Sequence, residues 1–262
     1  MKVSIVIAVL DSWEVVRRQI LHFKRMELDP ANYELIIVDD GSTPPLKMGL
    51  PLDFTSAIPG LYIIQSHDPR PWSQPCARNL GAEFATGEYL LMTDIDHVLS
   101  KEAILVAGEG GYDKMDFPRH WAVLTKDGEI CQDVEVLFLY GLPEKLYEER
   151  GLHGGHHSNT FAMRADIFAR LGGYDPRYCG RYGGDDVDFS KRYSHLCRKL
   201  GEVKPSVEGP PIYVYPDPRR DVKEVFHDTR RVRGSVNRID PICPACDLVY
   251  NHCFCNYPKP LD

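Results

Sequence analysis

Hydrophobic residues in the first hundred positions form short runs that alternate with amphipathic stretches. Four runs of β-branched and other apolar residues are bounded by polar, Gly or Pro residues, which predicts buried strands over residues 3–9, 34–38, 61–64 and 89–93. Between the first two runs, apolar residues recur at helical spacing at positions 16, 20 and 23. Asp11, with Glu14 three residues later, predicts the start of this helix. A second helix is predicted over residues 76–85, closed by Gly87.

This alternation of strands and helices predicts an α/β fold with a mostly parallel sheet, in which ligands bind beyond the carboxyl ends of the strands. The second half of the chain is less regular. Residues 134–140 are predicted to form a strand and residues 151–157 a flexible loop. Helical spacing returns over residues 164–171, before Gly172-Gly173, and again over residues 185–200.

Composition and charge narrow the classes of partner. The 262 residues carry a formal net charge of -7, with a pI near 5.8, which argues against binding to nucleic acid or to an anionic membrane surface. Because no apolar run approaches the roughly 18 residues of a membrane helix, we expect no integral membrane segment. The crowding of four of the eight cysteines near the C-terminus suggests a metal site more than a disulfide framework, so we expect a reducing compartment and a cytoplasmic protein. An anionic ligand would need a local basic patch; one candidate lies at Arg219, Arg220, Lys223, Arg230, Arg231 and Arg233.

Acidic residues follow two of the predicted strands. Asp39-Asp40-Gly41-Ser42 comes after the second, and Asp94-Ile95-Asp96-His97 after the fourth. In an extended segment, side chains two residues apart point to the same side, so Asp94 and Asp96 can share one ligand. Carboxylates suit Mg²⁺ or Mn²⁺, which commonly bridges protein carboxylates to substrate phosphates. Taken alone, the pair is equally well explained as a polar strand end.

The context of these residues resembles family 2 glycosyltransferases of the GT-A fold. Residues 3–42 and the run QPCARNLGAEFATGEYLLMTDIDHVLS, residues 74–100, carry the resemblance in the expected order. A third match is Gly172-Gly173-Tyr174-Asp175 followed by residues 183–189, GGDDVDF, which is similar to the acceptor-side Gly-Gly-Glu-Asp-x-Asp motif. The resemblance covers most of residues 3–200. It implies a catalytic domain over 1–237, with a nucleotide-binding half over 1–100 and an acceptor half over 101–237.

The resemblance also implies a reaction and a set of site residues. We expect metal-dependent transfer of a sugar from a nucleotide-sugar donor, a UDP-sugar being favoured, to a hydroxyl of a glycan or another acceptor. The resemblance implies that Asp186 is the base of an inverting reaction and that Asp185, where the family more often has Glu, lies on the acceptor side. The nucleotide is expected to contact Asp39, Asp40, Gly41, Ser42, Arg78 and Asp94, and the metal Asp94, Asp96 and His227.

Several alternatives remain open at this stage. A retaining enzyme of the polypeptide N-acetylgalactosaminyltransferase type shares the fold and a similar acceptor-side motif. A sugar-phosphate nucleotidyltransferase would carry a Gly-rich basic loop after the first strand, whereas this chain has Asp11-Ser12-Trp13-Glu14. A non-catalytic glycan-binding homologue would not need Asp94, Asp96 and Asp186 together. The acids at 185, 186 and 188 could also serve only to favour the helix start.

The eight cysteines are distributed unevenly. Cys243, Cys246, Cys253 and Cys255 crowd the last twenty residues, with His252 among them, and these are ligand types for structural Zn²⁺. We therefore expect a Cys-rich tail over 238–262 that either binds zinc or carries unliganded or disulfide-bonded cysteines. Cys76, Cys131, Cys179 and Cys197 are scattered and are expected to be small buried residues.

Overall fold

The computed structural model describes residues 1–54, 56, 58–70, 73–180 and 183–216. The first half alternates as the sequence predicts, with β1 (Val3–Val9), α1 (Trp13–Met26), β2 (Tyr33–Asp39), α2 (Leu46–Gly49), η1 (Leu52–Phe54), β3 (Leu61–Gln65), α3 (Gln74–Phe84), β4 (Tyr89–Thr93), β5 (His97–Val98) and α4 (Lys101–Glu109). The second half contains β6 (Lys114–Trp121), β7 (Val123–Leu124), β8 (Ile130–Cys131), α5 (Val134–Leu139), α6 (Glu144–Arg150), β9 (His153–Arg164), α7 (Ala165–Arg170), η2 (Pro176–Tyr178), α8 (Asp185–His195), the π-helical turn η3 (Leu196–Leu200), β10 (Val207–Glu208) and β11 (Ile212–Val214).

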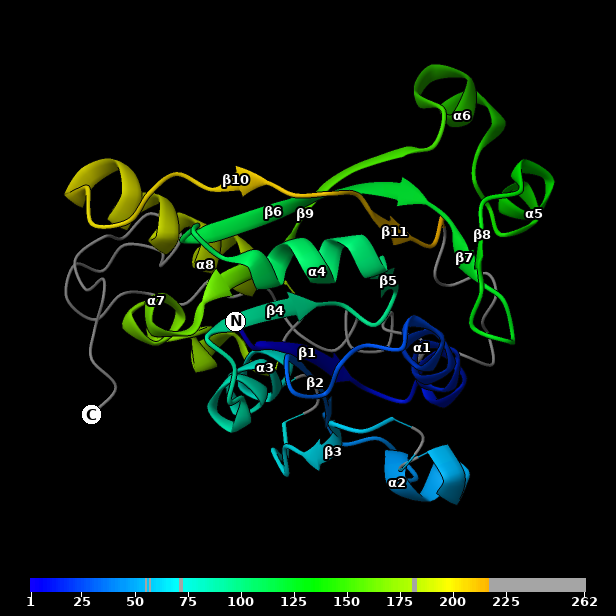
Figure 1. Cartoon of the computed structure of the whole chain (residues 1–262), viewed down its shortest axis with the longest axis horizontal. Coiled ribbons are helices and arrows are strands. Elements are labelled where there is room, and N and C mark those ends of the chain that lie inside the picture. Colours follow the sequence, from blue (N-terminus) through cyan, green and yellow to red (C-terminus); the bar gives the residue numbers. More distant parts are fainter. Residues whose placement is uncertain (55, 57, 71–72, 181–182, 217–262) are drawn as a thin grey trace.

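One large mixed sheet organises the molecule (Figure 1). Its strands lie in the order β3-β2-β1-β4-β9-β6-β11-β5, with β10 paired to β6, and β7 and β8 form a separate pair. The first four strands are parallel, whereas β9 is antiparallel to both β4 and β6. The predicted fold class, an α/β fold with a mostly parallel sheet, is confirmed.

Alternate residues of β1 point to opposite faces of the sheet, and helices cover both. Ile5 and Ile7 pack in a core with α1 and α4, while Val6 and Ala8 pack with α3, α7 and α8. Both side-chain sets are buried, as expected for a parallel strand covered on two sides. A smaller core around Leu137 and Tyr215 holds α5 against β7, at the end of the molecule away from α7 (Figure 1). The two large cores hold the strands in place from both faces of the sheet, and so they also position the rim where the carboxyl ends of β1, β2 and β4 meet.

Two assignments in the second half are wrong. The range 134–140, predicted to be a strand, contains helix α5 (Val134–Leu139), because the Asp133 carboxylate accepts hydrogen bonds from the backbone N–H groups of Glu135 and Val136 and caps a helix. Residues 153–157, expected within a flexible loop, begin the twelve-residue strand β9. Their ladder partners lie on β6, far away in sequence, so local composition does not reveal the strand.

The start of α1 also differs from the expectation. The residue before the helix is Ser12, and no side chain caps it. Asp11 instead has a left-handed φ of 48°, and its carboxylate accepts a hydrogen bond from the Thr43 N–H at 2.7 Å. Asp11 therefore ties the loop after β1 to the loop after β2.

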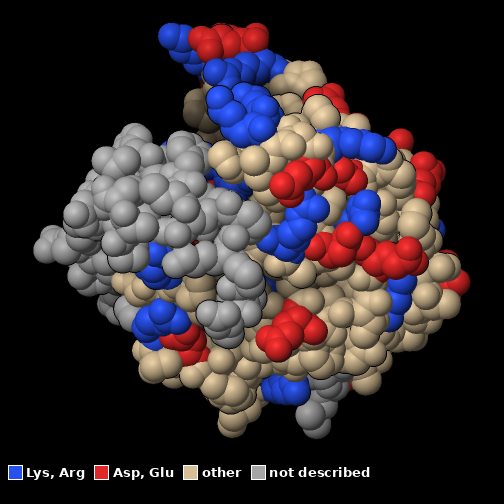
Figure 2. Space-filling view, turned by 90° about the vertical axis from the view of Figure 1, so that its left-hand side faces the viewer, with Lys and Arg blue, Asp and Glu red and all other residues tan. Residues whose placement is uncertain are grey.

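Charge on the described surface is mixed. On the face in Figure 2, acidic and basic side chains are interspersed. None of the helices in the described part of the chain combines the length and apolar character needed to cross a membrane.

Candidate active site

The loop after β2 is held by its own acidic residues. Asp39 accepts hydrogen bonds from the N–H groups of Ser42 and Leu46, each at 2.8 Å, one on each carboxylate oxygen. Gly41 adopts a φ of 94°, a left-handed conformation that favours glycine, and it leaves open space around its Cα. Asp39 thus shapes the loop in which the sequence predicts nucleotide-binding residues.

Asp40 points to the start of α3. It accepts hydrogen bonds from both the hydroxyl and the N–H of Ser73, and from the Ser66 hydroxyl at 3.2 Å. Burial raises the pKa of Asp40 to about 6, against the lowering effect of these hydrogen bonds. The loops after β2 and β3 and the start of α3 are therefore joined at one carboxylate.

Arg78 connects the two predicted motifs. Its side chain is buried on α3, and its guanidinium donates to Asp94 and, at 3.0 Å, to Asp185. Burial raises the pKa of Asp185, although Arg78 acts to lower it. Burial alone would raise the pKa of Asp94 as well, but the interactions of Asp94 with its neighbours, of which the Arg78 charge is the largest, outweigh burial, so this pKa is lowered. Asp94 is therefore ionised at neutral pH.

The Asp-x-Asp segment is a turn rather than an extended strand end. The His97 N–H donates to the Asp94 carbonyl at 3.1 Å, so the same-side argument for Asp94 and Asp96 does not apply as stated. Burial, and then the charge of Asp94, raise the pKa of Asp96 to about 6. The structure places both residues at the rim beyond β4, where the charge of Asp94 acts on Asp96.

Two histidines complete a group of possible metal donors. The ligand atoms of Asp94, His97 and His157 lie within 4.8 Å of one another, and His157 Nδ1 is 3.7 Å from Asp94 Oδ2. His97 is fully engaged, because its Nδ1 contacts the Thr160 hydroxyl and its Nε2 lies 3.3 Å from an Arg119 N–H donor. Burial lowers the pKa of His97 to about 3. Asp94 and His157 are the members with the greater freedom to bind a cation.

The acceptor-side motif opens α8. Asp186 accepts a hydrogen bond from the Ser158 hydroxyl on β9, and its side chain is partly exposed. Asp188 instead pairs with buried Arg192 at 2.9 Å, one turn along the same helix. Arg192 also donates to the carbonyls of Leu171 and Gly173. Asp188 therefore has a structural contact, whereas Asp186 faces outward beside Ser158.

The Gly-Gly-Tyr-Asp segment is fastened to α3 beside Arg78. Asn79 donates to the Tyr174 carbonyl at 2.7 Å and accepts from its N–H at 2.8 Å. The Tyr174 ring stacks on Phe189 of α8, with centroids 4.8 Å apart, and the Arg78 guanidinium lies 5.1 Å above it. The Ala-Arg-Asn sequence of α3 thus positions the acceptor-side motif directly.

Some predicted residues lie outside the described part of the chain. These are His227, the basic cluster from Arg219 to Arg233 and the tail cysteines Cys243, Cys246, Cys253 and Cys255. The four scattered cysteines are described, and the expectation that they are buried is wrong, because all four are partly exposed free thiols.

The sequence did not allow the contacts of His157 and Ser158 to be named. Both lie in or beside the stretch 151–157 that was expected to be a flexible loop, where polar side chains and glycines dominate the composition. The signal that could have placed them is Phe161-Ala162-Met163, an apolar run that continues the same strand into the buried sheet.

Comparisons with known proteins bear first on the fold. The described part of the chain has the fold of its solved GT-A neighbours. Residues 4–107, from β1 to α4, match the family described as Glycosyl transferase family 2. This match covers less than half of the chain and agrees there with the resemblance stated from the sequence. No curated protein matches the sequence significantly.

Solved structures support the fold over most of the chain. S. aureus TarS 1-349 in complex with UDP-GlcNAc is 16% identical with a TM-score of 0.56, covering 82% of this chain and 58% of that chain. Mannosyltransferase PcManGT from Pyrobaculum calidifontis, in complex with GDP-Man and Mn²⁺, is 14% identical with a TM-score of 0.53, covering 83% and 58%. This chain thus spans about three fifths of these structures.

Proposed function

We propose that the protein transfers a sugar from a UDP-sugar to an acceptor hydroxyl with inversion, using a divalent cation and Asp186 as base. The observation that carries this proposal is the Arg78 bridge, because it holds the predicted metal ligand Asp94 and the acceptor-side residue Asp185 against one guanidinium. A donor held at Asp94 would therefore lie beside the start of α8. The other parts of the proposal follow from the groups around this bridge.

Asp94 and His157 fit a divalent cation. They provide an ionised carboxylate and an imidazole nitrogen at the rim beyond β4, which are donors that Mn²⁺ accepts. Asp96 adds a second carboxylate in the same turn, and His227 is proposed as a further ligand. A bound cation would neutralise the negative charge of the leaving nucleoside diphosphate. UDP is favoured by the sequence resemblance, and the neighbours were solved with both UDP and GDP sugars.

Asp186 has the surroundings of a proton acceptor. It lies in the first turn of α8, where the helix dipole stabilises an ionised carboxylate. The Ser158 hydroxyl fixes one of its oxygens, which leaves the other oxygen to accept the proton of an acceptor hydroxyl. That hydroxyl oxygen then attacks the anomeric carbon while the bond to the diphosphate breaks, so one displacement inverts the configuration. Asp185 is proposed to help position the acceptor side through Arg78.

The first test is a donor panel measured as Mn²⁺-dependent release of nucleoside diphosphate. Asp186→Asn should lower kcat by about 10²-fold or more and leave the KM for donor nearly unchanged, since Asp186 is not proposed to contact the nucleotide. Asp166→Asn, an exposed acid paired with Arg164 on the surface, is the matched control and should keep full activity. Normal turnover by the Asp186 variant would remove the base assignment.

The second test separates the metal ligands. Isothermal titration of Mn²⁺ in the presence of UDP should show weaker binding for Asp94→Ala, Asp96→Ala and His157→Ala, and unchanged binding for Asp166→Asn. Equal affinity in all four variants would refute a cation at this rim.

Product stereochemistry decides between the enzymatic alternatives. Proton NMR of the product should show an inverted anomeric centre. Retention would support the polypeptide N-acetylgalactosaminyltransferase-like alternative, and donor binding without transfer to any acceptor would support a non-catalytic glycan-binding homologue.

A further inference from the structure

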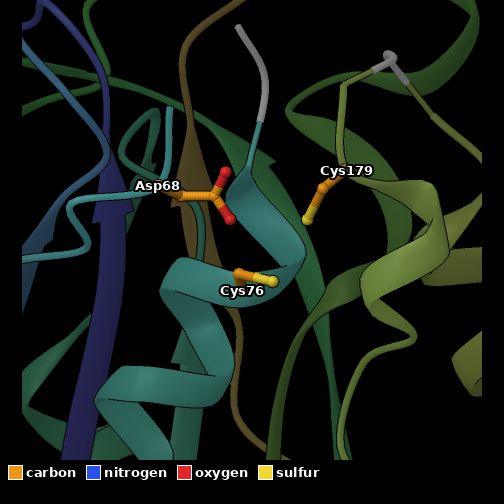
Figure 3. A group of neighbouring side chains, drawn as sticks. All are labelled: Asp68, Cys76 and Cys179. Atoms are coloured by element: carbon orange, nitrogen blue, oxygen red, sulfur yellow. The ribbon is translucent and has the colours of Figure 1, made fainter. Parts of the chain in front are cut away.

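A second group of metal-ligand side chains lies near the start of α3. Asp68 comes from the segment after β3, Cys76 from the first turn of α3, and Cys179 from the residue that follows η2. A carboxylate oxygen and the two sulfurs all lie within 4.8 Å of one another. Figure 3 shows the three side chains directed into one shared space between these segments. Three parts of the chain that are distant in sequence therefore meet at this point.

Arg70 donates hydrogen bonds to two members of this group. Its Nε donates to Asp68 Oδ1 at 2.8 Å, and its Nη2 donates to Asp68 Oδ2 at 2.5 Å and to Cys76 Sγ at 3.2 Å. Its Nη1 donates to the Pro176 carbonyl at 3.0 Å, which holds η2 close to the group. Hydrogen bonds of this kind to ligand atoms orient the ligands of protein metal sites.

We propose that Asp68, Cys76 and Cys179 bind a zinc ion that clamps the start of α3 to the segment after η2. Two sulfurs and one carboxylate oxygen are ligands that zinc prefers. Tetrahedral zinc with Zn–S bonds of about 2.3 Å places two sulfurs about 3.8 Å apart. The two sulfurs, which lie within 4.8 Å of each other, need to approach by about 1 Å or less to reach that geometry.

Charge supports zinc at this position. Two thiolates and a carboxylate carry three negative charges, and a divalent cation together with the Arg70 guanidinium carries three positive charges. Zinc binding displaces the thiol protons to solvent, and no electron is transferred. Among the described residues three protein ligands meet here, which leaves the fourth position of the ion for water.

The clamp would act on the catalytic parts without contacting substrate. Cys76 lies two residues before Arg78 on α3, and Cys179 lies six residues before Asp185. Zinc would thus fix the distance between the helix that carries the Arg78 bridge and the segment that leads to α8. This inference does not depend on the proposed sugar transfer, because the ion can bind whether or not the chain is active.

Cobalt substitution in the full-length protein tests the site. Co²⁺ bound to thiolates gives a ligand-to-metal charge-transfer absorption that a site of Asp94, His97 and His157 cannot give. Cys179→Ser should reduce this absorption and lower the zinc content by one ion per chain relative to wild type. Cys131→Ser, another partly exposed free thiol, is the matched control and should change neither quantity. The tail cysteines are present in every sample, so their contribution is the same throughout.

Asp68→Asn provides an independent measurement. This variant keeps both thiols and a hydrogen-bond acceptor for Arg70, and its zinc affinity, measured by chelator competition, should fall about tenfold or more. Unchanged zinc content in Cys179→Ser would overturn the proposal. So would unchanged affinity in Asp68→Asn, which decides the question if Cys179→Ser does not fold. A Cys76–Cys179 disulfide in the metal-free protein, with no zinc bound after its reduction, would also overturn it.

Discussion

Arg78 is the residue on which both motifs of the site depend. Its two carboxylate partners and the ring of Tyr174 surround it in the interior. A buried charge that loses its partner is strongly unfavourable. Removal of the Arg78 side chain would leave Asp94 and Asp185 without their shared positive charge.

We predict that Arg78→Met lowers the free energy of unfolding by about 3–5 kcal/mol, measured by urea denaturation at pH 7. Arg78→Lys should lose less of the free energy of unfolding, because the ammonium keeps the positive charge. It should still lose some, because an ammonium cannot donate to both carboxylates in a fixed geometry. As a control, Arg25→Met removes an exposed pair with Glu129 and should cost less than about 1 kcal/mol. Equal stability of the Met and wild-type proteins would contradict the bridge.

Asp40 predicts a pH dependence of stability. Its pKa is raised to about 6 in the folded protein, above its usual 3.8, so the folded state binds this proton more tightly than the unfolded state. The contribution of Asp40 to the unfolding free energy therefore falls as pH rises from 4 to 7, by about 2 kcal/mol. Asp40→Asn has no such titration. The stability of wild type relative to Asp40→Asn should decrease over this range in urea melts, and a constant difference would contradict the raised pKa.

At the level of elements, α3 and the Gly-Gly segment are fitted together without space for a side chain. Gly173 has a φ of 63°, and a Cβ there would lie 2.5 Å from the Asn79 amide oxygen. That oxygen is itself held by the Tyr174 N–H, so it cannot move aside without losing a hydrogen bond. Both the backbone conformation and the close contact require glycine at this position.

Gly173→Ala should therefore destabilise the protein more than a glycine substitution that adds strain alone. Gly111→Ala is the matched control, because Gly111 has a φ of 83° and a Cβ at this position would meet no other atom within 4 Å. Gly111→Ala should lower the free energy of unfolding by about 1–2 kcal/mol, and Gly173→Ala should lower it clearly more. Thermal unfolding of both variants measures the difference. Equal costs would show that the segment adjusts freely around Asn79.

The elements that sequence reasoning placed correctly are those whose signals are local. β1 to β4 are continuous apolar runs, and the Asp-Asp motif opens a helix as expected. The segment 134–139, VEVLFL, is rich in apolar and β-branched residues, which favours a strand, but the Asp133 side chain caps a helix there. Strand β9 contains Gly154-Gly155 and several polar residues, and only its pairing with β4 and β6 makes it a strand. The contact of Arg78 with two carboxylates could not be predicted either, because spacing along the chain does not give separation in space.

At the level of the whole molecule, the proposed donor site is assembled from loops at one rim of the sheet. A cation and nucleotide that bind only the folded state stabilise it by mass action. At about 100 times the dissociation constant, the gain is about 2.7 kcal/mol, which corresponds to a rise in Tm of about 5–10 °C for a domain of this size.

We predict this rise in differential scanning fluorimetry with Mn²⁺ and UDP together. UDP with a chelator should give a smaller rise, and Asp94→Asn should show no increase when Mn²⁺ is added to UDP. A shift that is the same with Mn²⁺ and with chelator would indicate that the nucleotide binds without a metal.

Strand β5 has a consequence for any attempt to divide this protein. The strand follows the Asp-x-Asp turn directly, yet it pairs with β11, at the opposite edge of the sheet from β3. A break in the chain after residue 100 would leave the two fragments sharing two hydrogen-bonded ladders, β4 with β9 and β5 with β11, and each fragment would expose open strand edges before they meet. Separately expressed fragments should therefore aggregate or reassemble with each other, and they should not behave as two independent modules.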